Sequence, residues 1–205
     1  KTLYGQALRD PDVRLISIAT RPDCLGDDVL ALLARIQEQK PVWVELGLQT
    51  IHEDTARYIR RGYPLSVFEE AVAKLRRLDI PVIVHTILFL PGETKEQMFQ
   101  TIQYLNNMGI QGIKLQLLHI LKGTDLALAY ERDPFHVPDM EEYLEVLTGC
   151  IARLNPEIVI HRLTGDGPKE LLIAPQWTKA KRTVLNRLEH ELKEKDIWQG
   201  KEYHD

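Results

Sequence analysis

Apolar segments that read as strands alternate with amphipathic segments along the chain, and this alternation limits the fold more than any other feature. The spacing predicts strands over 15–19, 42–48, 81–89, 113–118 and 157–161, and helices over 28–37, 66–77, 95–108 and 140–154. Such an order indicates repeated βα units, and therefore an α/β fold with a parallel sheet. We expect the first four of these strands to be neighbours in chain order.

The segment 42–48 has the strongest strand pattern. Branched apolar residues at every second position alternate with Trp43 and Gly47, which is typical of a parallel strand covered on both faces. Glu45 is the exception, because a buried carboxylate costs several kcal/mol unless it is paired or lies in a wet cleft. The position of Glu45 therefore indicates a site inside a barrel or at the mouth of a sheet.

Polar residues follow four of the predicted strands where they end. These residues are Thr20 with Arg21, Gln49 with Thr50, the turn 90–94, and the stretch 119–124. Ligands of α/β sheets and barrels bind at the carboxyl ends of the strands, so a shared ligand-binding mouth is predicted there. Four or five strands do not close an eight-stranded barrel, and a partial barrel or a curved sheet is expected.

The beginning and the end of the chain differ from its middle. Residues 1–8 have the spacing of the tail of a helix, and we expect a part of the protein to precede Lys1. The strand near Leu15 is then an exposed edge, through which the chain self-associates unless another element covers it. We interpret 155–205 as a C-terminal α/β extension of a core spanning 1–154, with a last helix over about 178–195.

Two of the predicted helices begin with the pattern of a capping box, Ser66 with Glu69 and Thr94 with Gln97. In such a box, a side chain at each end of the first turn satisfies a backbone amide at the other end. Both boxes are therefore expected to mark where their helices start.

Composition argues against several classes of protein. A net charge of −4 gives no general attraction to nucleic acid, and no apolar run is long enough to cross a bilayer. No signal peptide is visible, so a cytoplasmic protein without membrane contact is expected. Cys24 and Cys150 lie far apart and lack the spacing of metal ligands, and we interpret them as free thiols.

Three side chains near the predicted mouth could carry chemistry, and the residues alone leave alternatives open. Arg61 suits a carboxylate or phosphate if a helical turn returns it to the mouth, and otherwise it is a solvated arginine. His85 is either a ligand contact or acid/base group, or a satisfied core histidine. Glu45, His85 and His119 together could hold the metal of a β/α-barrel lyase or hydrolase, although no HxH or HExxH spacing supports this.

Taken together, these pieces resemble the radical SAM superfamily. The likeness is strongest to a bacterial subfamily of uncharacterised Fe–S proteins related to the Elongator catalytic subunit and to oxygen-independent coproporphyrinogen oxidase. The matching segments are 18–23, 45–50, 61–62, 87–94, 112–115, 118–119, 121–124, 161–168 and 172–175. The resemblance implies a partial (β/α)6 TIM-like barrel lacking its first two strands, so that this chain corresponds to the C-terminal two-thirds of such a protein.

The resemblance also implies a cofactor and a radical reaction. Such proteins bind S-adenosylmethionine at a 4Fe–4S cluster on a CxxxCxxC loop and cleave it reductively to a 5′-deoxyadenosyl radical, which abstracts hydrogen from a substrate. By this likeness, Gln49 and His85 contact the ribose, Arg61 meets the methionine carboxylate, and Ile87 and Leu118 lie near the adenine. Thr20 and Arg21 lie beside them and contact cofactor or substrate.

The chain departs from the family pattern at two points. It contains no CxxxCxxC, and Cys24 alone cannot replace three ligands, so we expect this chain to hold no cluster and to be an inactive fragment of an oxidoreductase-like enzyme. Phe89 stands where relatives often carry glycine. The substrate stays open, with a small molecule or tRNA as candidates, and a non-catalytic binding or scaffold domain is the alternative outside the enzymes.

Overall fold

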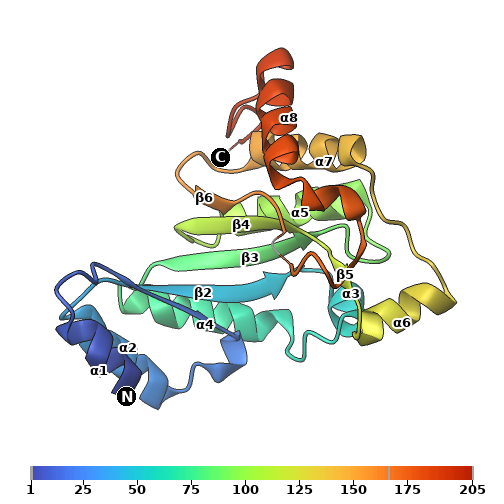
Figure 1. Cartoon of the computed structure of the whole chain (residues 1–205). Helices are drawn as coiled ribbons and strands as arrows, with labels where there is room; N and C mark the ends of the chain where they lie inside the picture. Colours follow the sequence, from blue (N-terminus) through green and yellow to red (C-terminus); the bar gives the residue numbers. More distant parts are fainter. Residues whose placement is uncertain (1, 166, 205) are drawn as a thin grey trace.

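The fold is built on one parallel sheet. A computed structural model describes residues 2–165 and 167–204, and its main sheet has the strand order β1-β2-β3-β4-β6 (Figure 1). The strands are β1 (Ile16–Thr20), β2 (Val42–Gln49), β3 (Val82–Leu88), β4 (Gly112–Leu117) and β6 (Val159–Arg162), and each neighbouring pair is parallel. This confirms the predicted α/β fold and the neighbouring order of the first four strands.

Helices seal one face of this sheet and leave the other face open. In β2, Val44 and Leu46 are fully buried, whereas Glu45 and Gly47, on the opposite face, are half-buried. The buried face forms one hydrophobic core with the helices α2 (Asp27–Gln37), α4 (Leu65–Arg77), α5 (Lys95–Asn106) and α7 (Met140–Arg153). The open face carries polar side chains such as Glu45 and His85 among apolar ones such as Trp43 and Ile87.

Two further helices lie at the two ends of the chain. Helix α1 (Thr2–Arg9) precedes β1 and lies near α2, and α8 (Lys181–Glu194) packs on α7 (Figure 1). Among the described strands, β1 pairs with β2 alone, so it is an edge of the sheet, and self-association through it stays a prediction. Among the described helices, none is long and apolar enough to cross a membrane.

The two predicted capping boxes have different outcomes. At α5 the Gln97 N–H donates to Thr94 Oγ1 over 3.2 Å, and the Thr94 N–H donates to Gln97 Oε1 over 2.9 Å, which confirms the box. The box at Ser66 is wrong, because α4 already begins at Leu65, after Pro64 as N-cap. The Leu65 N–H donates instead to the Glu53 carboxylate over 2.6 Å, so a residue of another helix satisfies this amide.

Four short elements, none of them delimited by the sequence pattern, gather beyond the carboxyl ends of β2, β3 and β4. Helix α3 (Glu53–Tyr58) follows β2, and α6 (Asp125–Arg132) follows β5 (Ile120–Leu121). Strand β7 (Leu172–Ala174) pairs antiparallel with β5 and so returns the C-terminal segment to this edge of the sheet. Figure 1 shows α3 and β5 near the end of β2, with α6 further out beyond α3.

Candidate functional site

A cavity of about 850 Å³ lies at the carboxyl ends of β2, β3 and β4. Its floor contains Gly47 and Gln49 of β2, Ile87 of β3, and Leu118, which follows β4. Its side walls come from the end of α3 and from α6. The volume lies in the range of about 300–1,000 Å³ that is usual for small-molecule sites.

The cavity brings together five of the seven residues that the resemblance assigns to cofactor or substrate. These are Arg21, Gln49, Arg61, Ile87 and Leu118. Neither Thr20 nor His85 lines it: Thr20 ends β1 directly before Arg21, and His85 precedes Ile87 by two residues on the same face of β3. Their roles, like those of the other five, stay predictions.

Three residues at or beside the cavity have a left-handed backbone although they are not glycine. Gln49 has φ 64°, Arg60 has φ 56° and Phe89 has φ 59°. Such conformations cost about 1–3 kcal/mol each and are concentrated at functional sites. Phe89 is the position at which glycine is expected from the resemblance, and glycine adopts this backbone without strain.

Arg61 is buried, with 1% of its side chain exposed, so the interpretation of Arg61 as a solvated arginine is wrong. Its Nε donates to the Tyr63 carbonyl over 2.9 Å, Nη1 to the Thr50 carbonyl over 2.7 Å, and Nη2 to Glu53 Oε1 over 2.8 Å. Nη1 also lies 3.5 Å from the Leu48 carbonyl. These contacts tie the loop before α4 to the end of β2 and occupy most of the five guanidinium donors.

Tyr63 is a cavity residue that the sequence analysis missed. Its hydroxyl donates to the Gly47 carbonyl and lies 3.4 Å from Gln49 Oε1, and the guanidinium groups of Arg21 and Arg61 lie 5.5 and 5.1 Å from its ring centre. Burial raises the pKa of Tyr63 more than the two arginines lower it, so the hydroxyl stays a donor at neutral pH. Tyr63 thereby orients the side chain of Gln49 and holds the rim of the floor.

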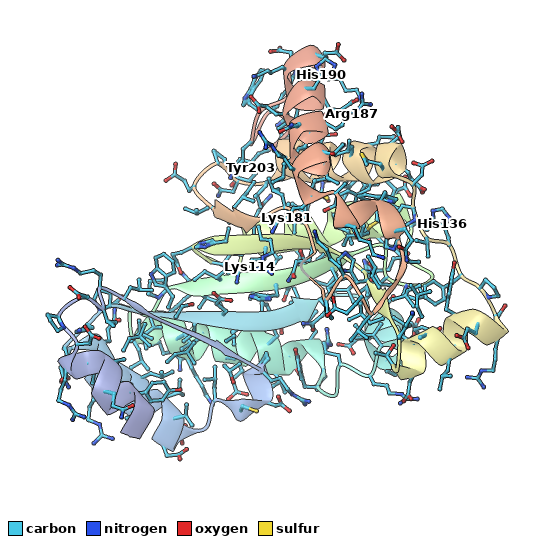
Figure 2. All side chains as sticks on the ribbon, in the orientation of Figure 1. Lys114, His136, Lys181, Arg187, His190 and Tyr203 are labelled. Carbon is cyan, nitrogen blue, oxygen red and sulfur yellow. The ribbon has the colours of Figure 1, made fainter. Side chains whose placement is uncertain are left out.

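A second cluster of polar side chains lies on the open face of the sheet, at positions that precede the cavity residues along each strand. Glu45 Oε1 accepts from Ser17 Oγ over 2.8 Å, and Glu45 Oε2 accepts from Lys114 Nζ and, over 2.8 Å, from His85 Nε2. His85 Nδ1 lies 3.3 Å from Gln116 Nε2 and accepts its proton. Figure 2 labels Lys114 on this face. Glu45 is therefore the paired carboxylate that its strand position required.

The titration of this group follows from its contacts. Burial alone would raise the pKa of Glu45, but the hydrogen bonds from Lys114, His85 and Ser17 outweigh it and lower that pKa to about 2. Burial lowers the pKa of His85 more than the hydrogen bond to Glu45 raises it. At neutral pH Glu45 is therefore a carboxylate, and His85 is a neutral imidazole with its proton on Nε2.

The alternative of a metal-dependent lyase or hydrolase using Glu45, His85 and His119 is wrong. The third partner of Glu45 and His85 is the ammonium of Lys114, which repels a cation. His119 lines a separate pocket of about 220 Å³. Within residues 2–165 and 167–204, no group of three His, Cys, Asp or Glu side chains is placed to hold a metal ion.

Glu45 should make the stability of the protein fall in acid. Because its folded pKa lies below the unfolded value of 4.5, its contribution is present above pH 4.5 and is lost as the pH falls towards 2. We expect this contribution to the free energy of unfolding to be about 1–2 kcal/mol, because solvent at the open face screens the partly exposed carboxylate. Glu45→Gln should lower the urea-unfolding free energy at about pH 6.5, and the difference from the parent should shrink at about pH 3.

Glu38→Gln is the matched control for this change, because Glu38 is an exposed residue at the end of α2. It should leave the unfolding free energy unchanged at both pH values. A constant difference between Glu45→Gln and the parent across this pH range would show that the low pKa does not stabilise the fold.

Comparisons with known proteins agree with this geometry. Residues 3–105 match the model of the Radical SAM superfamily, and residues 110–194 match that of the Radical_SAM C-terminal domain. The uncharacterized protein YtqA of Bacillus subtilis is 43% identical over 198 residues, which are 97% of this chain and 62% of that protein. Protein YhcC of Escherichia coli is 33% identical over 96% of this chain and 64% of its own length. The chain thus spans less than two thirds of the length of these relatives.

Solved structures show the same fold. The archaeal Methanocaldococcus infernus Elp3 superposes with a TM-score of 0.78 at 18% identity, over 89% of this chain and 42% of that one. Coproporphyrinogen III oxidase of Escherichia coli, described as a radical SAM enzyme, superposes with a TM-score of 0.54 at 19% identity, over 68% and 32%. At these low sequence identities, the similarity shows a TIM-barrel-like fold and nothing further.

Proposed function

The chain belongs to the radical SAM superfamily, and from this premise we propose that it forms the S-adenosylmethionine-binding part of a radical SAM enzyme. In the whole protein, S-adenosylmethionine would supply the radical that removes hydrogen from the substrate. The observation that carries this proposal is the cavity at the strand ends, which gathers Arg21, Gln49, Arg61, Ile87 and Leu118 from five separate segments.

The chemistry of the cavity fits this cofactor. Ile87, Leu90 and Leu118 offer an apolar surface for a purine, and the amide of Gln49 offers both a donor and an acceptor for ribose hydroxyls. The guanidinium of Arg21 lines the same cavity and pairs with the partly exposed Asp23 over 2.6 Å, so a cofactor carboxylate would have to take the place of Asp23 as its partner. In this role the residues bind and orient the cofactor, and the apolar floor keeps water from it.

The described residues do not fit a 4Fe–4S cluster. The chain has two cysteines, of which Cys24 is exposed beside β1 and Cys150 is buried in the core. Burial raises the pKa of the Cys150 thiol to about 12, so this residue is a poor source of thiolate. We propose that residues outside this sequence hold the cluster in the whole protein.

Anaerobic reconstitution tests the position of the cluster ligands. With iron and sulfide, this chain should show no stoichiometric cluster, because a cluster of this type needs three thiolates from the protein beside the cofactor. The whole protein should show a visible absorbance band and about four irons per chain. Cys24→Ser in the whole protein serves as the control and should leave both signals unchanged. A band with matching iron content on this chain alone would contradict the proposed position of the ligands.

Turnover separates the enzyme from a non-catalytic scaffold. Given a reductant, the reconstituted whole protein should release 5′-deoxyadenosine and methionine from S-adenosylmethionine. A scaffold domain would release neither, even with the fold intact. The substrate that donates the hydrogen is either a small molecule or tRNA. Each candidate is added in turn, and the true substrate should increase the release of 5′-deoxyadenosine.

A further inference from the structure

The wall of the cavity opposite the strand ends is formed by α6, together with Tyr58 and Arg60 at the end of α3. We call this surface the α6 wall. None of the residues assigned to the cofactor lies on α6. The cavity therefore has a sheet side, which fits S-adenosylmethionine, and a second side whose ligand the resemblance does not name.

The face that α6 turns to the cavity is amphipathic along its length. Asp125, Leu128, Ala129 and Arg132 all line the cavity, at the spacing i, i+3, i+4 and i+7 that places residues on one face of a helix. The apolar pair lies in the middle of this face, with a charge at each end. Such a face can bury an apolar body and bind a charged group at one end.

Two large apolar side chains of the α6 wall are exposed. Leu128 is 57% exposed, and Tyr58, which comes from α3, is 51% exposed. They are two of the six large apolar residues that are exposed in the described part of the chain, and both line the same cavity. Exposed apolar side chains that gather at one concave surface mark ligand sites more often than scattered ones do.

Two guanidinium groups of the α6 wall can meet an anion. Arg60 pairs with Asp125 over 2.5 Å, but both side chains are more than 70% exposed, and such a pair stabilises the fold little. A ligand anion can therefore replace Asp125 as the partner of Arg60. Arg132 donates from Nε to the Leu128 carbonyl over 3.3 Å and makes no ion pair within the described residues.

We propose that the α6 wall binds an organic anion with an apolar body. A carboxylate or phosphate meets Arg60 and Arg132, and the apolar body lies against Tyr58 and Leu128. That this anion is the substrate of the enzyme rests on the function proposed above, whereas its binding does not.

Three probes with one apolar body test the proposal on the whole protein: 1-naphthyl phosphate, 1-naphthoate and the neutral 1-naphthalenemethanol. Calorimetric titration should show at least one anion binding about tenfold more tightly than the alcohol, because charge-assisted hydrogen bonds to guanidinium are strong. The tighter of the two anions tells whether the site prefers phosphate or carboxylate. Saturating S-adenosylhomocysteine should not displace it, since the two ligands contact different walls of the cavity.

Variants assign the binding to the α6 wall. Arg60→Gln and Arg132→Gln should each weaken anion binding about tenfold and leave the alcohol unchanged, whereas Leu128→Ser should weaken all three probes. Arg57→Gln is the matched control, because Arg57 lies on α3, is exposed, pairs with Asp54 and does not line the cavity. All four positions are exposed, so folding should be preserved.

The proposal is overturned if the alcohol binds as tightly as both anions, if Arg57→Gln acts like Arg60→Gln, or if S-adenosylhomocysteine displaces the anion. A whole protein that binds no cluster and no S-adenosylmethionine, yet shows the anion preference and its loss in both arginine variants, would refute the proposed function and still support the α6 wall. The two proposals can therefore fail separately.

Discussion

Replacing Gly47 with valine is expected to lower the affinity of the whole protein for S-adenosylmethionine by about 10- to 100-fold. A Cβ atom at Gly47 would lie 2.5 Å from Gln49 Nε2 and 3.5 Å from the Tyr63 hydroxyl, so the new side chain must push the Gln49 amide from its place on the cavity floor. A ligand that uses this floor loses its hydrogen bonds to the Gln49 amide, each worth about 0.5–1.5 kcal/mol, and each 1.4 kcal/mol is a tenfold change in affinity.

The fold itself should tolerate this change. Gly47 lies within β2, where its φ is not left-handed, and valine is favoured in strands. The melting temperature should therefore change little while equilibrium titration shows the loss of binding. Ala19→Val is the control, since Ala19 is exposed on β1 and does not line the cavity. Unchanged affinity in Gly47→Val would mean that the cofactor does not use this floor.

Replacing Arg61 with alanine is expected to have the largest effect on stability, a loss of about 3 kcal/mol. The change leaves the buried carbonyls of Thr50 and Tyr63 without their donor, and an unsatisfied buried group costs about 1–3 kcal/mol. For a chain of this length, such a loss lowers the melting temperature by roughly 6–12 °C. Arg61→Lys should restore only a part, because lysine lacks the planar fork that reaches several acceptors at once.

Arg60, the residue directly before Arg61, is the matched control. Its pair with Asp125 is exposed, so Arg60→Ala should cost less than about 1 kcal/mol. Equal losses at Arg60 and Arg61 would contradict the structural role of the buried guanidinium. Titration of S-adenosylmethionine against folded Arg61→Ala protein then tests separately whether this residue also meets the cofactor carboxylate.

Much of the fold could be predicted because periodicity is local. The alternation in 42–48 placed β2 within one residue of its observed end, and Thr94 with Gln97 marked the start of α5. The box at Ser66 failed for a non-local reason, since the carboxylate that satisfies the first turn of α4 comes from Glu53, twelve residues before Leu65. Strands as short as β5 and β7 have no period for a pattern to reveal.

The candidate site, like the fold, could be predicted from the sequence only in part. Residues at the ends of strands could be predicted to converge, because the carboxyl ends of parallel strands share an edge, and Arg21, Gln49, Ile87 and Leu118 do line one cavity. Tyr63 and Lys114 were missed because their roles depend on contacts across space: Lys114 lies opposite His85 in the register of β3 and β4. The alternation of Lys114 with the buried Ile113 and Leu115 was the available signal that it faces the open side.

The left-handed residues that end two adjacent strands also matter for engineering this fold. Gln49 closes β2 and Phe89 follows β3, and at each of them the chain leaves the sheet in a direction set by its own backbone, with φ 64° and 59°. Chimeras that exchange loops after β2 or β3 between relatives should therefore keep Gln49 and Phe89, because these two residues set the direction in which the chain leaves the sheet.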